Sequence, residues 1–174
     1  MEAARLSIGP PLRCAQDARH SMQRLELKVP PVAIGLAMAL LMWLASWIVP
    51  ALGLTFQGRR VLAICLAIAG TLISGSGVVL FQQAHTTVNP MKPESSSSLV
   101  QWGIYKWTRN PMYLGFLLVL VAWAVYLSNA LAFLILPVFI AYMNRFQIEP
   151  EERALKTLFG DEFSKYATRV RRWI

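Results

Sequence analysis

The sequence predicts an all-α integral membrane protein with about four transmembrane helices, followed by amphipathic C-terminal helices on the cytoplasmic side. Composition is the first reason: 56% of the 174 residues are hydrophobic and only 15% are charged, whereas about a quarter of the residues in soluble domains are charged. The second reason is that the apolar residues are gathered in long runs. Such runs are typical of helices that cross a bilayer.

Four runs are candidate spans: about Pro31 to Pro50, about Val61 to Phe81, Met112 to Leu127, and Ala130 to about Ile148. At about 1.5 Å per residue, the first is long enough for a hydrocarbon core about 30 Å thick. The second is rich in small residues between Gly70 and Gly77, which lets a neighbouring helix approach closely. The third and fourth are separated by two residues and predict a tight helical hairpin.

Basic residues are distributed unevenly. Of the 17 Lys and Arg residues, all but Arg59 and Arg60 lie in the N-terminal segment, the central loop 82–111 or the tail from Arg145 onward. By the positive-inside rule, we expect both termini and the central loop in the cytoplasm, with a bacterial inner membrane as the location. Because the basic residues flank apolar runs, the net charge of +8 does not indicate nucleic-acid binding.

The chain divides into three segments on this basis. Residues 1–29 form a basic cytoplasmic arm, residues 30–82 hold two transmembrane helices, and residues 83–174 hold the loop, hairpin and tail of the expected functional core. Residues 1–21 contain no apolar stretch like that of a signal peptide, and Met22 is an alternative start. Two cysteines and two histidines, widely scattered, predict neither a disulfide framework nor a metal site.

Asn110-Pro111 is a helix-start signal at the cytoplasmic face, because Asn is a favoured N-cap and Pro a favoured first residue. The first N–H groups of a helix have no intrahelical partner and carry partial positive charge. They predict a site for a carboxylate or a hydroxyl-rich ligand. The alternative is simply a well-capped transmembrane helix.

Arg145 and Glu149 are four residues apart and share a helix face at the cytoplasmic end of the fourth span. Charges near the membrane interface are costly and usually functional. The alternative is a snorkelling Arg with a weak partner.

The tail after Ile148 is polar and amphipathic. Pro150 disfavours helical geometry at Glu149 and predicts a new helix, with Glu151 and Glu152 as ordinary first-turn acids. Gly160 is expected to break that helix. The next stretch places Phe163, Tyr166, Val170 and Trp173 on one stripe, so it lies on the membrane surface or covers something there.

Two blocks carry a family resemblance. The first runs from Leu99 to Gly115 and contains Gly103-Ile104-Tyr105 and Arg109-Asn110-Pro111-Met112-Tyr113. The second runs from Arg145 to Tyr166 and contains Glu149, Glu151-Glu152 and Phe159-Gly160. In this order and spacing they resemble the isoprenylcysteine carboxyl methyltransferase family, which is related to the membrane phospholipid methyltransferases. The likeness covers about residues 85 to 173.

The resemblance implies an S-adenosylmethionine-dependent methyltransferase, embedded in the membrane, that methylates a lipophilic acceptor at the cytoplasmic face. The acceptor would resemble an isoprenylcysteine carboxylate or a lipid. In the family, the loop and the following helix start hold the cofactor; the matching residues are Leu99, Val100, Tyr105, Asn110, Pro111, Met112 and Tyr113. The resemblance also implies that Glu149 contacts the cofactor and that Arg145 orients the acceptor.

The sequence departs from the family at Asn110. Many family members have His at this position, and since Asn cannot titrate, no acid–base role is carried over to it.

Two other functions remain open: a non-catalytic membrane scaffold or transporter, and a sterol-reductase-like branch with the same fold. The matching cofactor loop together with Arg145 and Glu149 favours the methyltransferase.

Overall fold

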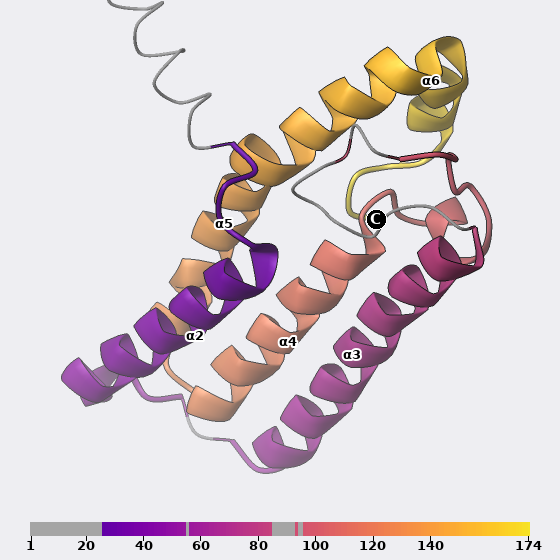
Figure 1. Cartoon of the computed structure of the whole chain (residues 1–174). Helices are drawn as coiled ribbons and strands as arrows, with labels where there is room; N and C mark the ends of the chain where they lie inside the picture. The colour runs from indigo at the N-terminus through magenta and orange to yellow at the C-terminus, as the bar shows by residue number, and fades with distance from the viewer. Residues whose placement is uncertain (1–25, 55, 85–92, 94–95) are drawn as a thin grey trace, which may run out of the picture.

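The structure is a computed structural model that describes residues 26–54, 56–84, 93 and 96–174 (Figure 1). Its elements are α2 (Pro31–Ile48), η1 (Pro50–Leu52), α3 (Arg59–Gln83), η3 (Gly103–Lys106), α4 (Pro111–Leu127), α5 (Ala130–Met143), η4 (Asn144–Ile148) and α6 (Glu149–Arg169). No β-strand occurs in this part of the chain. The possible start at Met22 and most of the turn-rich linker before Ser96 lie outside the described residues.

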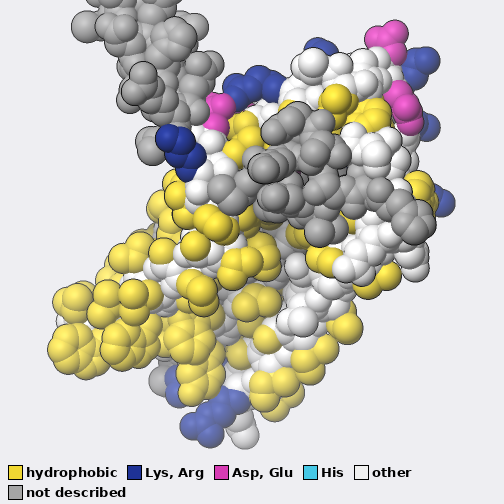
Figure 2. Space-filling model, viewed as in Figure 1, with side chains coloured by type: hydrophobic (Ala, Val, Ile, Leu, Met, Phe, Trp, Pro, Cys, Tyr) yellow, Lys and Arg dark blue, Asp and Glu magenta, His cyan; other side chains and the backbone are white. Residues whose placement is uncertain are grey.

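The helices have the length and surface of membrane spans. Three helical segments of the described chain are long and apolar enough to cross a bilayer: Pro31–Ile48, Arg59–Gln83 and the continuous segment Ala130–Arg169. α4 is apolar but shorter, at 17 residues. Large apolar side chains cover the outside of α2 and α3, among them Leu36, Trp47 and Leu72, and they form the hydrophobic belt in Figure 2. The predicted all-α membrane class is confirmed, with α4 as the short fourth helix.

α4 occupies the centre of the bundle and packs against α2, α3 and α5. Its contact with α3 is very close: a Cβ atom added to Gly115 would lie 2.5 Å from the Gly70 carbonyl oxygen and 2.6 Å from the Ser74 Cβ atom. Gly77 likewise faces Pro111 at the start of α4. The small residues of α3 therefore allow the close helix approach that the sequence predicts.

The junction between α5 and α6 differs from the prediction. Glu149 has helical dihedral angles (φ −61°, ψ −44°) and its N–H donates to the carbonyl oxygen of Asn144, closing a π-helical turn. The chain therefore continues without a break at Pro150, because the wider turn accommodates the residue before proline in helical geometry. The expected break at Gly160 is present, where φ is 50° and ψ is −118°.

Segments that are far apart in sequence meet at one end of the bundle (Figure 1). The Leu27 N–H donates to the Phe146 carbonyl oxygen at 3.1 Å, and Thr108 Oγ1 donates to the carbonyl oxygen of Arg172 at 3.1 Å. Residues 26–29 thus lie against η4, and the loop before α4 lies against the C-terminal tail. Arg59 and Arg60 begin α3, at the opposite end of the bundle.

The α3–α4 contact gives the first prediction. Gly115→Ala should destabilise the protein by about 1–3 kcal/mol, because the added methyl group meets backbone atoms that cannot move aside. Gly75→Ala is the matched control, since a Cβ atom there meets nothing within 4 Å, and alanine favours a helix by roughly 0.5–1 kcal/mol. Thermal unfolding in detergent measures both. Equal melting temperatures would contradict the close contact.

Candidate functional site

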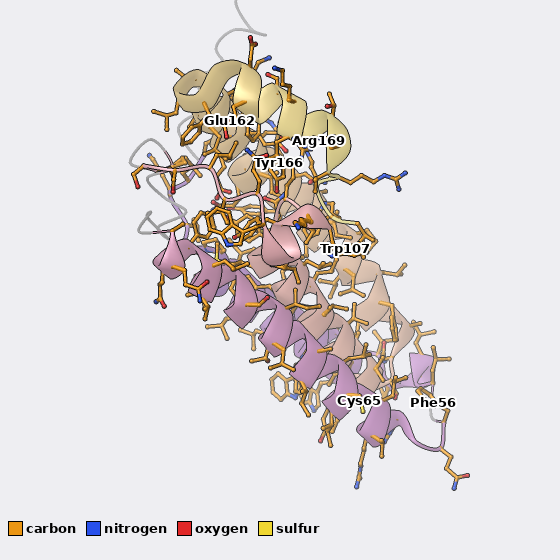
Figure 3. All side chains as sticks on the ribbon, turned by 90° about the vertical axis from the view of Figure 1, so that its right-hand side faces the viewer. Phe56, Cys65, Trp107, Glu162, Tyr166 and Arg169 are labelled. Carbon is orange, nitrogen blue, oxygen red and sulfur yellow. The ribbon has the colours of Figure 1, made fainter. Side chains whose placement is uncertain are left out.

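A cavity lies where the loop before α4, the first turn of α4 and the inner face of α6 meet. Its walls combine apolar, aromatic and charged side chains: Phe81, Pro93, Ser96, Ser98, Leu99, Val100, Tyr105, Arg109, Asn110, Pro111, Met112, Tyr113, Glu151, Glu152, Leu155, Phe163 and Tyr166. Figure 3 shows Tyr166 on the side of α6 that faces the bundle, whereas Cys65 and Phe56 lie near the other end. The amphipathic tail thus buries its apolar stripe over this cavity.

Tyr113 and Glu151 form a hydrogen-bonded pair in the cavity wall, in which the Tyr113 hydroxyl donates to Glu151 Oε1. Glu151 follows the apolar stretch that ends at Ile148, and it belongs to the polar helix α6. Burial raises the pKa of Glu151 to about 8; the negative charge of Glu152 adds to this effect, and the hydrogen bond from Tyr113 opposes it. At neutral pH this carboxyl group is therefore largely protonated.

Tyr105 presents an unpaired hydroxyl group. Its ring is buried and meets the ring of Phe81 edge to face, with the centroids 5.2 Å apart. The Tyr166 hydroxyl donates to the Tyr105 carbonyl oxygen at 2.8 Å, but Tyr105 Oη itself has no hydrogen-bond partner among the described residues. Burial raises the pKa of Tyr105, and the neighbouring Tyr166 and Glu151 raise it further. The phenol of this cavity-lining residue is therefore protonated and has a free donor.

Glu152 joins the loop to the tail. It accepts hydrogen bonds from Nε and Nη2 of Arg172, at 3.1 Å and 2.7 Å, and lies 3.2 Å from Arg109 Nη2. The hydrogen bonds from Arg172 to Glu152 raise the pKa of this guanidinium above its ordinary value. In the described part of the chain, Arg109 Nε is buried without a partner, so it is a second free donor beside the cavity.

Asn110 precedes α4 as predicted, but its side chain does not cap the helix. Asn110 Nδ2 instead donates to the carbonyl oxygen of Arg172 at 3.0 Å. The N–H of Asn110 donates to Thr108 Oγ1 at 3.1 Å. Asn110 is thus the N-cap residue by position, as predicted, while its side chain bonds the returning tail. The first N–H groups of α4 consequently remain uncapped by a side chain.

The residues proposed from the sequence fall into two places. Seven of them line the cavity: Leu99, Val100, Tyr105, Asn110, Pro111, Met112 and Tyr113. Arg145 and Glu149 do not. The predicted pair exists, with Arg145 Nη1 3.5 Å from Glu149 Oε2, but Arg145 Nη1 is also 2.9 Å from Glu26 Oε1. Glu149 lies in an adjoining hollow that shares Arg109 and Glu152 with the cavity.

The sequence interpretation did not assign Arg109, Glu151, Glu152, Phe163 and Tyr166 to the site, and all of them line the cavity. One signal in the sequence points to the two glutamates. Between Leu27 and Ile148 the chain has a single acidic residue, Glu94. The acidic residues that start α6 are therefore the main source of carboxylates near the apolar helices.

The bundle and its cavity define a membrane-embedded helical protein with a polar site at one end. The sequence model of the phospholipid methyltransferase family matches residues 58–162. The chain belongs to this family. The matched region includes α3, α4, α5, the loop between α3 and α4, and the first part of α6, and thus most of the cavity wall.

Individual relatives are similar to parts of the chain. An uncharacterised protein from Haemophilus influenzae is 49% identical over 63 residues, which are 36% of this chain and all of that protein. Protein-S-isoprenylcysteine O-methyltransferase B from Arabidopsis thaliana is 29% identical over 105 residues, covering 60% of this chain and 53% of the relative. The Saccharomyces cerevisiae protein-S-isoprenylcysteine O-methyltransferase is 35% identical over 82 residues, covering 45% and 33%. The matches span about half or less of these two methyltransferases.

The buried Glu151 carboxyl group predicts a pH effect. Its pKa is about 8 in the folded protein, against an ordinary value of 4.5, so the folded state holds a proton that the unfolded state releases. This stabilisation is complete below about pH 4.5 and is lost as the pH rises through about 8. We expect the melting temperature to fall between pH 6 and pH 9, and to fall less in Glu151→Gln.

Asp161→Asn is the control for this measurement, because Asp161 is an exposed acid on the same helix. Its melting temperature should follow the unmodified protein across the pH range. Parallel curves for Glu151→Gln and the unmodified protein would contradict the burial of this carboxyl group.

Proposed function

We propose that the protein is an S-adenosylmethionine-dependent methyltransferase that acts on a lipophilic acceptor at the cytoplasmic face of the membrane. The observation that carries this proposal is the cavity, most of whose wall belongs to the matched family region and which is lined by two residues with free donors, Tyr105 Oη and Arg109 Nε. The catalytic core would be residues 83–174. The family match is to methyltransferases and gives no support to a transporter or a sterol reductase.

The chemical groups of the cavity suit S-adenosylmethionine. The uncapped N–H groups at the start of α4 and the Arg109 side chain are donors for its carboxylate. Glu152, and Glu151 in either protonation state, accept hydrogen bonds from ribose hydroxyls or an ammonium group. Val100, Leu155 and Phe163 provide an apolar wall for an adenine ring. Unpaired buried polar atoms cost free energy, so a ligand that bonds Tyr105 and Arg109 is favoured.

The cavity must widen to admit this cofactor. It encloses about 90 Å³, whereas small-molecule sites enclose about 300–1,000 Å³. Its walls come from the loop, α4 and α6, which are held together by the Glu152 contacts. Binding therefore requires these segments to separate, and the ligand would then link them.

The bound cofactor supplies an electrophilic methyl group on a sulfonium. The protein's own contribution is to hold the acceptor in line with that group and to exclude water, since transfer from a cation to an anion is favoured in a dry site. Arg145 is the proposed acceptor-orienting residue, with Glu149 as a further cofactor contact. Arg145 already holds the Glu26 carboxylate, and a guanidinium can bind an acceptor carboxylate in the same manner. Asn110 transfers no proton.

Ligand binding tests the proposal. S-adenosylmethionine or its demethylated product should raise the thermal stability of the purified protein, by about 2.7 kcal/mol at 100 times Kd. Tyr105→Phe should weaken this binding about tenfold, the effect of one lost hydrogen bond, without destabilising the ligand-free protein. Tyr166→Phe is the matched control, because it removes a structural hydrogen bond and should lower the ligand-free stability. No shift with millimolar ligand would refute the cofactor assignment.

Arg145 allows a separate test of catalysis. With labelled S-adenosylmethionine and an isoprenylcysteine carboxylate or a membrane lipid extract as acceptor, Arg145→Ala should lower turnover by about 10²-fold or more and leave cofactor affinity unchanged. Arg153→Ala is the control, because Arg153 also contacts Glu26 and has no proposed role with the acceptor. If the two variants lost the same activity, the Glu26 contact, and not acceptor orientation, would explain the effect.

A further inference from the structure

An apolar groove runs between α2 and α3 on the outside of the bundle. Both helices pack on α4, and the space between them encloses about 660 Å³. Leu36 of α2, Ile64 of α3 and Val119 of α4 line it, and all three are exposed. The indole of Trp123 lines the groove too, and its N–H is already occupied by the Ala39 carbonyl oxygen at 3.0 Å. The groove therefore offers contacts for a hydrocarbon chain and few for a polar ligand.

One end of the groove carries a positive charge. Arg60, in the first turn of α3, is the charged residue among those that line it, and Tyr126 lines it at the last turn of α4. A second hollow, which includes Gln57 and Arg59, adjoins the groove through Arg60. Figure 2 shows Lys or Arg side chains at this lower end, next to the hydrophobic belt and far from the acidic side chains.

The described part of the chain provides no anion near this charge. There is no acidic residue between Glu26 and Glu94, and the acids of α6 lie at the other end of the bundle. Within the described residues, the ion pairs join Glu26, Glu149 and Glu152 to other arginines. A negative partner for Arg60 must therefore come from outside the described chain.

We propose that this groove binds an anionic glycerophospholipid, with the phosphate at Arg60 and one acyl chain along α4. The position of the Arg60 charge distinguishes this lipid from the methyl acceptor. An acceptor would place its reactive group near the cavity, at the opposite end of α4, and would leave only its apolar tail near Arg60. A lipid whose headgroup lies at Arg60 matches both the charge and the apolar walls.

A second copy of the chain fits the groove less well. The helices that could enter it are free of acidic residues, because Glu94 is the one acid from residue 27 to residue 148. Docking of such a helix would bury the Arg60 charge without a carboxylate partner, which is costly in a membrane. The charge pattern therefore favours a lipid phosphate.

Two pairs of variants test the proposal. Arg60→Gln removes the charge that lines the groove, whereas Arg59→Gln removes the neighbouring charge, which does not line it. Gly35→Leu adds an apolar side chain to the groove lining, and Gly75→Leu adds the same side chain elsewhere. An added Cβ atom has nothing within 4 Å at either glycine. All four are compared with the unmodified protein in detergent by native mass spectrometry, with phosphatidylglycerol and phosphatidylcholine as competing probes.

We expect the unmodified protein, Arg59→Gln and Gly75→Leu to retain phosphatidylglycerol in preference to phosphatidylcholine. Arg60→Gln should bind it about tenfold more weakly, as loss of one charge-assisted contact predicts. Gly35→Leu should also bind it more weakly, because the added side chain occupies the place of the acyl chain. Equal losses in Arg59→Gln and Arg60→Gln would mean a diffuse surface charge and would overturn the site. Equal retention of both lipids, or a dimer that dissociates on Gly35→Leu, would overturn it as well.

Discussion

The polar end of this bundle depends on one carboxylate, Glu152, which binds the loop before α4 through Arg109 and the C-terminal tail through Arg172. The side chains of Arg109 and Glu152 are only 14% and 18% exposed, so water competes weakly for the contact. Its removal would leave the largely buried Arg109 side chain without its carboxylate partner, which costs more than the loss of an exposed ion pair. Together with the hydrogen bond from Tyr113 to Glu151, this contact holds α6 over the start of α4.

Local sequence signals were sufficient to predict the apolar helices and one wall of the cavity. The apolar runs are long, and the small residues of α3 lie within one helix. The spans and the close helix contact could therefore be predicted without tertiary information. The residues from Leu99 to Tyr113 also line one cavity partly because they are close in sequence, in a short loop followed by a single helical turn. Their proximity was therefore predictable from the motif alone.

The other wall was not predictable, because it depends on how the chain turns after α5. A π-helical turn adds about one residue to a regular helix and rotates everything after it by roughly 100°. Glu149 keeps the predicted contact with Arg145, four residues earlier, and lies in the adjoining hollow, whereas Glu151 and Glu152 line the cavity. The hydrogen-bond partner of the Asn110 side chain was not predictable for a similar reason: it is the carbonyl oxygen of Arg172, 62 residues away, and no local signal contains that contact.

The same scarcity of acidic residues shapes both ends of the molecule. At the polar end, the glutamates of α6 and Glu26 neutralise the arginines of the loop, tail and η4, so that segments distant in sequence are joined by charge. At the other end, Arg59 and Arg60 lie in a stretch of sequence, from Glu26 to Glu94, that has no acidic residue in between. Lipid phosphates are the anions available at a bilayer surface. One end therefore pairs four of its arginines within the chain and encloses a cavity, whereas the other leaves its cations to the membrane.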